Sequence, residues 1–271
     1  MRTLKILLVL VLVVVTLVFG ITEIRERTSG KSDGPKISCA QETLEISVRD
    51  DESLLLTGVT AVDRQDGDLT GRILVAGVSK LITDDTARVS YLVFDSDDNV
   101  GSLSRYVRYT DYQRPWFQVS EPLVYAGTGS VQLLDRITAT DSVDAPEVIN
   151  ESIRVSSLWP TEDSNVYSVT VQVTNSLGDT ARVSLPVILW ESDGNRPEIL
   201  LKEQLVYLDQ GTAFDARSYI ASVTAPNGTP TARDVEIDSQ VNVTEPGNYW
   251  VYYTYSGGGS QALAILTVVV Q

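Results

Sequence analysis

Three proline-led segments recur along the chain at nearly constant spacing, and they limit its fold more than any other feature. "GPKISCAQETLEI", "RPWFQVSEPLVYAG" and "RPEILLKEQLVYLDQG" each contain a proline followed by a strand-like run. Pro35, Pro115 and Pro197 are separated by 115 − 35 = 80 and 197 − 115 = 82 residues. Tyr167 and Tyr249 are 249 − 167 = 82 residues apart, so the ends of the second and third segments stay in step. A repeat of this period predicts one structural unit used three times.

Each repeat consists of short runs rich in β-branched and aromatic residues, which are bounded by turn residues. Its end is an explicit hairpin, as in "NVYSVTVQVTNSLGDTARVSLPVIL" and "GNYWVYYTYSGGGSQALAILTVVV". About eighty residues with six or seven strands is the size of an immunoglobulin-like β-sandwich. The sequence therefore predicts an all-β chain of three tandem sandwiches, with no amphipathic helix after the N-terminal region.

The N-terminal stretch "MRTLKILLVLVLVVVTLVFGITEIRER" carries Arg2 and Lys5 and then no charge from residue 6 to residue 21. Such a run engages the secretion machinery. We expect a signal-anchor helix over 1–21, because the run is nearly long enough to span a bilayer and Val18-Phe19-Gly20 is a poor cleavage site. A polar linker over 22–34 and domains over 35–113, 114–195 and 196–271 would follow. The domains would face outward from the cell membrane; cleavage and secretion are the alternative.

Composition excludes several classes of function. Acidic residues number 36 against 21 basic ones, a net charge of −15, which repels nucleic-acid phosphates and makes nucleic acid an unexpected partner. The chain has no histidine, so neither a Ser-His-Asp triad nor an imidazole zinc site can form. The lone Cys39 allows no intrachain disulfide, which favours a bacterial surface protein or a cytosolic one, and the apolar N-terminal run favours the first. We therefore expect no enzyme activity and no catalytic residue.

Two acidic loops of the first repeat are the candidate metal site. "AVDRQDGDLTGRILV" follows the second strand, and "FDSDDN" joins the last two strands. In a sandwich of this type both loops lie at the same end, and calcium takes six to eight oxygen ligands from such loops. The alternative is that these residues are turn formers, whose side chains bond nearby amides. The predicted calcium ligands are Asp63, Asp66, Asp68, Asp95 and Asp97. A degenerate version of the pattern stands in the second repeat, with Asp141, Asp144 and Glu147 facing Asn175 and Asp179.

An aromatic run in the third repeat is the candidate ligand surface. Tyr249, Trp250, Tyr252, Tyr253 and Tyr255 lie on one predicted strand. Side chains alternate between the two faces of a strand, so Trp250 and Tyr252 share the face opposite Tyr253. Those two residues could form an exposed platform for a sugar or a protein. Ordinary packing within the sheet or between domains is the alternative.

"VTAVDRQDGDLTGRILVAGV", followed by a strand that ends in "FDSDDN", resembles the bacterial immunoglobulin-like repeats of Gram-positive surface proteins, whose relatives occur in pesticidal crystal proteins. The second repeat keeps the later half of the pattern in "VYSVTVQVTNSLGDTA". The resemblance implies a stalk, adhesion or interaction module at the cell surface, partnered by other envelope proteins. The alternative is an accessory protein that binds carbohydrate or peptidoglycan.

Overall fold

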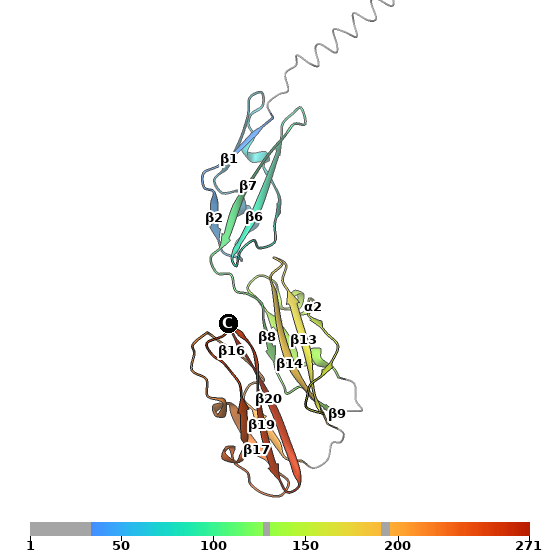
Figure 1. Ribbon diagram of the computed structural model, residues 1–271. Helices are drawn as coiled ribbons and strands as arrows, with labels where there is room; N and C mark the ends of the chain where they lie inside the picture. The colour runs from blue at the N-terminus through green and yellow to red at the C-terminus, as the bar shows by residue number, and fades with distance from the viewer. Residues whose placement is uncertain (1–33, 127–130, 191–195) are drawn as a thin grey trace, which may run out of the picture. The chain divides into compact units, whose positions relative to one another are not determined.

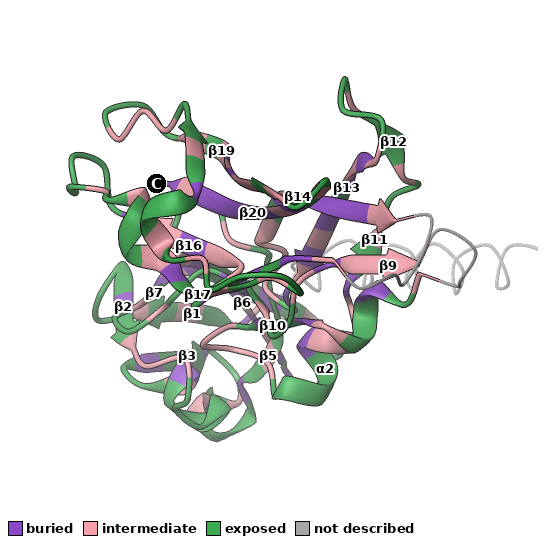
Figure 2. Ribbon diagram, turned by 90° about the horizontal axis from the view of Figure 1, so that it is seen from below, coloured by how far each residue is buried: buried purple, intermediate pink, exposed green. Residues whose placement is uncertain are grey.

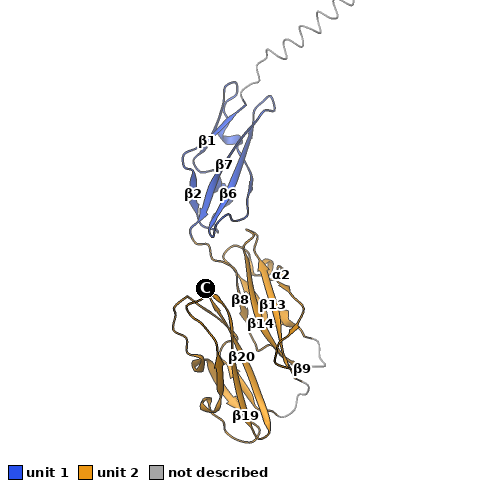
Figure 3. Ribbon diagram, viewed as in Figure 1, with its two compact units in different colours: residues 1–110 blue, residues 111–271 orange. Residues whose placement is uncertain are grey.

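The computed structural model describes residues 34–126, 131–190 and 196–271. These residues form short strands joined by loops and a few helical turns (Figure 1), so the prediction of an all-β chain is confirmed. The chain divides into two compact units (Figure 3), the first ending at Thr110 and the second running from Asp111 to Gln271. The division lies three residues from the predicted boundary after residue 113, since 113 − 110 = 3. The second and third predicted domains lie together in unit 2.

Unit 1 is a sandwich of two sheets. One sheet has the order β1-β3-β4, and the other has the order β2-β7-β6-β5. The bounds are β1 Lys36–Cys39, β2 Thr43–Ile46, β3 Val59–Asp63, β4 Gly67–Asp68, β5 Leu74–Val78, β6 Thr86–Phe94 and β7 Val100–Tyr109. β2 runs parallel to β7, and the other pairs are antiparallel. Alternate residues of β6, Val89, Tyr91 and Val93, are fully buried, as the period of two in the sequence requires.

A buried arginine is part of the core of unit 1. Arg105 on β7 is 3% exposed. Its Nε donates to the Tyr91 hydroxyl at 2.8 Å, and its terminal nitrogen donates to the carbonyls of Leu55 and Thr57 at 2.9 and 2.8 Å. The Tyr91 hydroxyl itself donates to the carbonyl of Leu55. One cation thus fixes the 3-10 helix Glu52–Leu56 against the sheet.

The second sandwich, within residues 116–190, has sheets in the orders β8-β10 and β11-β13-β14-β9, with β12 also paired to β13. The bounds are β8 Trp116–Val119, β9 Val124–Ala126, β10 Ile137–Thr140, β11 Arg154–Val155, β12 Trp159–Pro160, β13 Val166–Thr174 and β14 Thr180–Trp190. A short helix, α2 (Pro146–Glu151), was not predicted. Pro146 opens it, and the Asn150 amide bonds the backbone N–H and C=O of Ala139 on β10.

The third sandwich, residues 198–270, has sheets in the orders β15-β17 and β16-β20-β19-β18. The bounds are β15 Glu198–Leu201, β16 Leu205–Leu208, β17 Ile220–Thr224, β18 Glu236–Ser239, β19 Gly247–Gly257 and β20 Ser260–Val270. A parallel partner, β2, β9 or β16, lies beside the last strand of each sandwich. The buried residues of unit 2 follow the long strands β13, β14 and β20 (Figure 2), and each of its sandwiches has its own hydrophobic core.

The predicted signal-anchor helix over residues 1–21 and nearly all of the predicted linker lie outside the described residues. Within the described ranges, no helix is both long enough and apolar enough to cross a membrane.

Candidate functional site

The first acidic loop of unit 1 is a turn held by its own carboxylates. Asp63 Oδ1 accepts hydrogen bonds from the backbone amides of Gln65 and Asp66 at 2.6 and 2.9 Å. Asp68 Oδ1 accepts from the amide of Thr70 at 2.9 Å. The amide of Asp66, followed by that of Gln65, lowers the pKa of Asp63, and hydrogen bonds from Thr70 lower the pKa of Asp68. Gly67 has φ 75°, a left-handed conformation that glycine adopts without strain.

The second acidic loop is built in the same way and is tied to the first. Asp95 Oδ1 accepts from the amides of Asp97 and Asn99 at 2.9 and 2.8 Å, and its Oδ2 accepts from the Asn99 side chain at 2.8 Å. Asp66 reaches across from the first loop. Its Oδ2 accepts from the amide of Ser96 at 2.5 Å, and its Oδ1 accepts from the Ser96 hydroxyl at 2.8 Å. The two loops therefore lie at one end of the sandwich.

This geometry distributes the predicted calcium ligands among separate turns. Asp63 and Asp68 bond within the first loop, Asp95 bonds within the second, and Asp97 is exposed. Asp63 Oδ2 is buried without a hydrogen-bond partner. This single oxygen is far fewer than the six to eight oxygen ligands that a calcium ion takes. Among the residues that the structure describes, no three acidic, cysteine or histidine side chains are placed to hold a metal ion. The contacts are those of the turn alternative, and the calcium site stays a prediction.

The second sandwich repeats the tie between loops. Asp141 Oδ1 accepts from the amide of Asp144 at 2.8 Å, and Asp144 Oδ2 accepts from the amide of Ser176 at 2.8 Å. The pairs Asp63 with Asp66 and Asp141 with Asp144 are 141 − 63 = 78 residues apart. We call this arrangement the aspartate clamp: the first aspartate forms the turn, and the second bonds the serine amide of the final hairpin. As with Asp63, the Oδ2 of Asp141 is buried without a partner.

The β13–β14 hairpin of the second sandwich also holds the start of unit 2. Asp179 accepts from the Tyr112 hydroxyl at 2.7 Å and from Arg114, whose Nε is 3.2 Å from Asp179 Oδ2. Burial raises the pKa of Asp179, but the hydrogen bonds from Tyr112 and Arg114 outweigh it, so that the net shift is downward. Burial, reinforced by the Asp179 carboxylate, raises the pKa of Tyr112. The first residues of unit 2 are therefore fixed to the β13–β14 hairpin.

Replacing Asp66 with alanine tests the clamp. We expect the free energy of unfolding of unit 1 to fall by about 1–2 kcal/mol, because the amide and hydroxyl of Ser96 lose their acceptor. Asp97→Ala is the matched control, since the Asp97 side chain is exposed in the same hairpin. Chemical denaturation of the full chain measures both.

We also expect calcium to shift the melting temperature no more than magnesium does. A calcium-specific rise that Asp66→Ala abolishes would favour the metal site.

The aromatic strand lies at the junction between the two sandwiches of unit 2. Trp250 on β19 donates its indole Nε1 to the carbonyl of Ser184 on β14 at 3.0 Å. Asn248 Oδ1 accepts from the amide of Ser184 at 2.9 Å. Trp250 and Tyr252 also pack against a cluster of Val166, Ile188 and Ile265. Trp250 and Tyr252, which were predicted as an exposed ligand platform, are thus part of a contact between the two sandwiches. This is the alternative in which the aromatic residues pack between domains.

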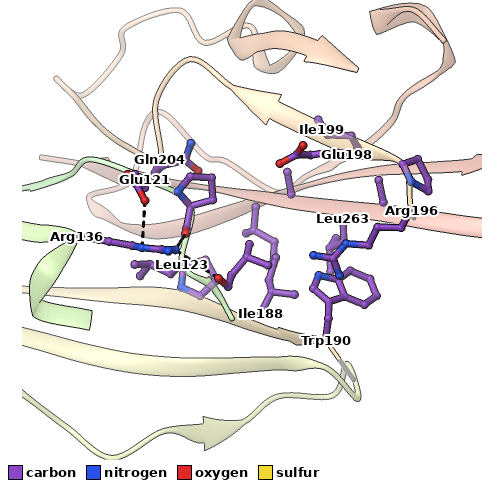
Figure 4. A pocket seen from close by; sticks show the side chains of 17 residues that line it. Glu121, Leu123, Arg136, Ile188, Trp190, Arg196, Glu198, Ile199, Gln204 and Leu263 are labelled. Carbon is purple, nitrogen blue, oxygen red and sulfur yellow. Dashed lines mark hydrogen bonds and ion pairs between the residues drawn. The ribbon is translucent and has the colours of Figure 1, made fainter. Parts of the chain in front are cut away.

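A cavity of about 330 Å³ adjoins this junction and was not predicted (Figure 4). Its floor is one face of β14, formed by Pro186, Ile188 and Trp190. Its walls come from the segment before β15 and from β20. The remaining lining residues are Glu121, Pro122, Leu123, Val124, Arg136, Arg196, Pro197, Glu198, Ile199, Gln204, Ala262, Leu263, Ala264 and Ile265. The volume falls at the lower end of the range for ligand pockets.

The two arginines of the cavity lie at its two ends (Figure 4). At one end, Arg136 Nε is 3.3 Å from Glu121 Oε2, and the guanidinium also bonds the carbonyl of Pro122. At the other end, the Arg196 guanidinium lies 4.5 Å from the centre of the Trp190 ring. Glu198 adds a second carboxylate, so arginines and acids balance. The cavity therefore favours a ligand without large net charge.

No protein-family model and no curated protein sequence matches the chain. Among solved structures, a chain with the CBM51-2 and INT domains of ZmpB from Clostridium perfringens, in complex with GlcNAc, is 19% identical. That match has a TM-score of 0.24 and covers 55% of this chain and 26% of the other. A protocadherin gammaB7 EC3-6 structure is 9% identical, with a TM-score of 0.22 and coverage of 86% and 73%. The chain thus spans about a quarter of the ZmpB chain. Similarity at this level does not assign a function, so the function is inferred from the residues of the chain.

Proposed function

We propose that this chain is a non-enzymatic stalk or interaction module of the cell surface, of the bacterial immunoglobulin-like kind that its sequence resembles. The observation that carries the proposal is the junction in unit 2. There, two sandwiches are joined by packed aromatic side chains and by the hydrogen bonds of Trp250 and Asn248 to one residue, Ser184. A stalk needs such a joint, because it must hold its distal part at a fixed position.

The chemistry of the loops supports the same role. The carboxylates at the sandwich end in unit 1 accept hydrogen bonds from backbone amides and so stiffen the loops. A general acid requires a carboxyl group in an apolar pocket. Asp63 and Asp68 have lowered pKa values instead and are ionised at neutral pH. Their arrangement is that of structural turns.

Labelling of an introduced cysteine tests the proposed location. Asn227 lies in an exposed loop of the third sandwich. We expect Asn227→Cys, in a chain that also carries Cys39→Ser, to react on intact cells with a maleimide that cannot cross membranes. The Cys39→Ser chain without the second change is the control for background. Labelling that occurs only after the cells are permeabilised would contradict the proposal.

A further inference from the structure

The last strand of each sandwich has one edge that its parallel partner covers only in part. β2 pairs with residues 106–109 of β7, β9 with residues 188–190 of β14, and β16 with residues 267–270 of β20. The rest of that edge would present unpaired backbone groups, which native proteins usually cover or interrupt. The three sandwiches differ in what lies beside this stretch of edge.

In the first two sandwiches other segments of the chain lie against the last strand. Beside β7, the backbone of Pro35 lies so near Gly101 that a Cβ there would be 2.0 Å from the Pro35 carbonyl oxygen. On β14, Asn248 and Trp250 bond the backbone of Ser184, and the next outward position is Pro186, which has no N–H to offer. The amide of Ile188 bonds Leu123 on the same side, which fixes this alternation.

In the third sandwich the same edge opens into the cavity. Four consecutive residues of β20, Ala262 to Ile265, line it. Consecutive residues point to opposite faces of a strand, so all four can line one cavity where it meets the edge. The amide of Thr267 bonds Gln204 on this side. By alternation, Leu263 and Ile265 direct their N–H and C=O groups to the same side, beyond the end of β16 among the described strands.

We propose that the cavity receives an extended peptide segment of a partner protein, which adds to the free edge of β20 as a continuation of β16. Main-chain hydrogen bonds to Leu263 and Ile265 would supply affinity. Side chains of the segment that point to one face would meet Ile188 and Trp190, so we expect apolar residues at alternate positions. The balanced charges of the cavity, two arginines and two glutamates, fit a segment with little net charge. This inference deepens the proposed interaction role and rests on it.

The test uses the full chain and an acetylated, amidated hexapeptide of alternating threonine and valine. We expect the hexapeptide to bind and to slow hydrogen exchange over residues 260–266, measured by mass spectrometry. An analogue with methylated valine amides should bind at least tenfold more weakly, because it cannot donate ladder hydrogen bonds. A tetramer of N-acetylglucosamine is the glycan control. Protection by the tetramer alone, or no protection by the hexapeptide at millimolar concentration, would overturn the proposal.

Proline substitution supplies a matched pair of variants. Leu263→Pro removes an N–H that points to the cavity and leaves the β19 ladder intact, as Pro186 does on β14. We expect Leu263→Pro to fold and to lose at least tenfold in hexapeptide affinity relative to Leu263→Ala. Unchanged affinity in Leu263→Pro would place the hexapeptide elsewhere and refute the site. Surface labelling at Asn227 is independent of this experiment, so failure of the site and failure of the proposed location can be told apart.

Discussion

Replacing Trp250 with alanine is expected to uncouple the two sandwiches of unit 2 and to lower its free energy of unfolding by roughly 2–3 kcal/mol. The indole packs against the cluster of Val166, Ile188 and Ile265 and donates a hydrogen bond to Ser184. Its removal opens a void in the junction and leaves the Ser184 carbonyl without that donor. Calorimetry of the full chain should show the transition of unit 2 separating into two, because each sandwich keeps its own core.

Two further variants divide this effect into packing and hydrogen bonding. Trp250→Phe keeps much of the packing and removes the indole N–H, so we expect a loss of about 1 kcal/mol. Trp159→Ala is the matched control, because Trp159 on β12 is 66% exposed and its truncation should change stability by less than about 0.5 kcal/mol. Equal losses in Trp250→Ala and Trp159→Ala would show that the junction contributes little to coupling, and the stalk proposal would lose its main support.

The runs of β-branched and aromatic residues were enough to predict the long strands of each final hairpin, but not the short strands such as β4, β11 and β12. Val89, Tyr91 and Val93 recur with a period of two and are fully buried on β6. The meeting of the two acidic loops also followed from topology, since Asp66 bonds Ser96 as expected for loops at one end. The sequence left the choice between metal ligands and turn formers open, because aspartate serves both and the direction of each carboxylate depends on the folded loop.

Contacts between sandwiches lay beyond what the repeat could predict. The face shared by Trp250 and Tyr252 was recognised, but whether a neighbour covers it depends on how consecutive sandwiches are oriented, and a period of about eighty residues carries no information on that. The cavity was missed for the same reason, since its lining joins residues from both sandwiches. Pro186 was a signal that could have been used, because proline inside a strand indicates an open edge.

Arg105 was not predicted as a core residue, although it occupies an inward-facing position in the alternation of β7. Leu103 and Val107 face the core, and a residue midway between them must share that face. A charged residue at an inward position is costly unless hydrogen bonds satisfy it, so it marks a specific polar contact. The sequence does not show which groups would accept from it. The acceptors are backbone carbonyls near a 3-10 helix and a tyrosine hydroxyl, and they come together only in the fold.

Replacing Arg105 with alanine is therefore expected to lower the free energy of unfolding of unit 1 by about 3 kcal/mol. The carbonyls of Leu55 and Thr57 would lose a charged donor, and the Tyr91 hydroxyl would keep its bond to Leu55 but lose the donor that it accepts from. Chemical denaturation of the full chain measures the loss. Arg105→Lys is expected to recover part of it at most, because one ammonium cannot reproduce the planar fork that bonds three oxygens.

Arg108→Ala is the matched control for this prediction. Arg108 is on the same strand, but its side chain is 49% exposed and pairs with Glu45, which is 55% exposed. A surface pair of this kind contributes about 0–1 kcal/mol. The two arginines differ in burial and in partners, so their variants compare a cation that organises the core with one that is solvated. If Arg105→Ala were no more destabilising than Arg108→Ala, the 3-10 helix Glu52–Leu56 would be held by the apolar contacts of Leu55 and Leu56, and the buried cation would have no structural role.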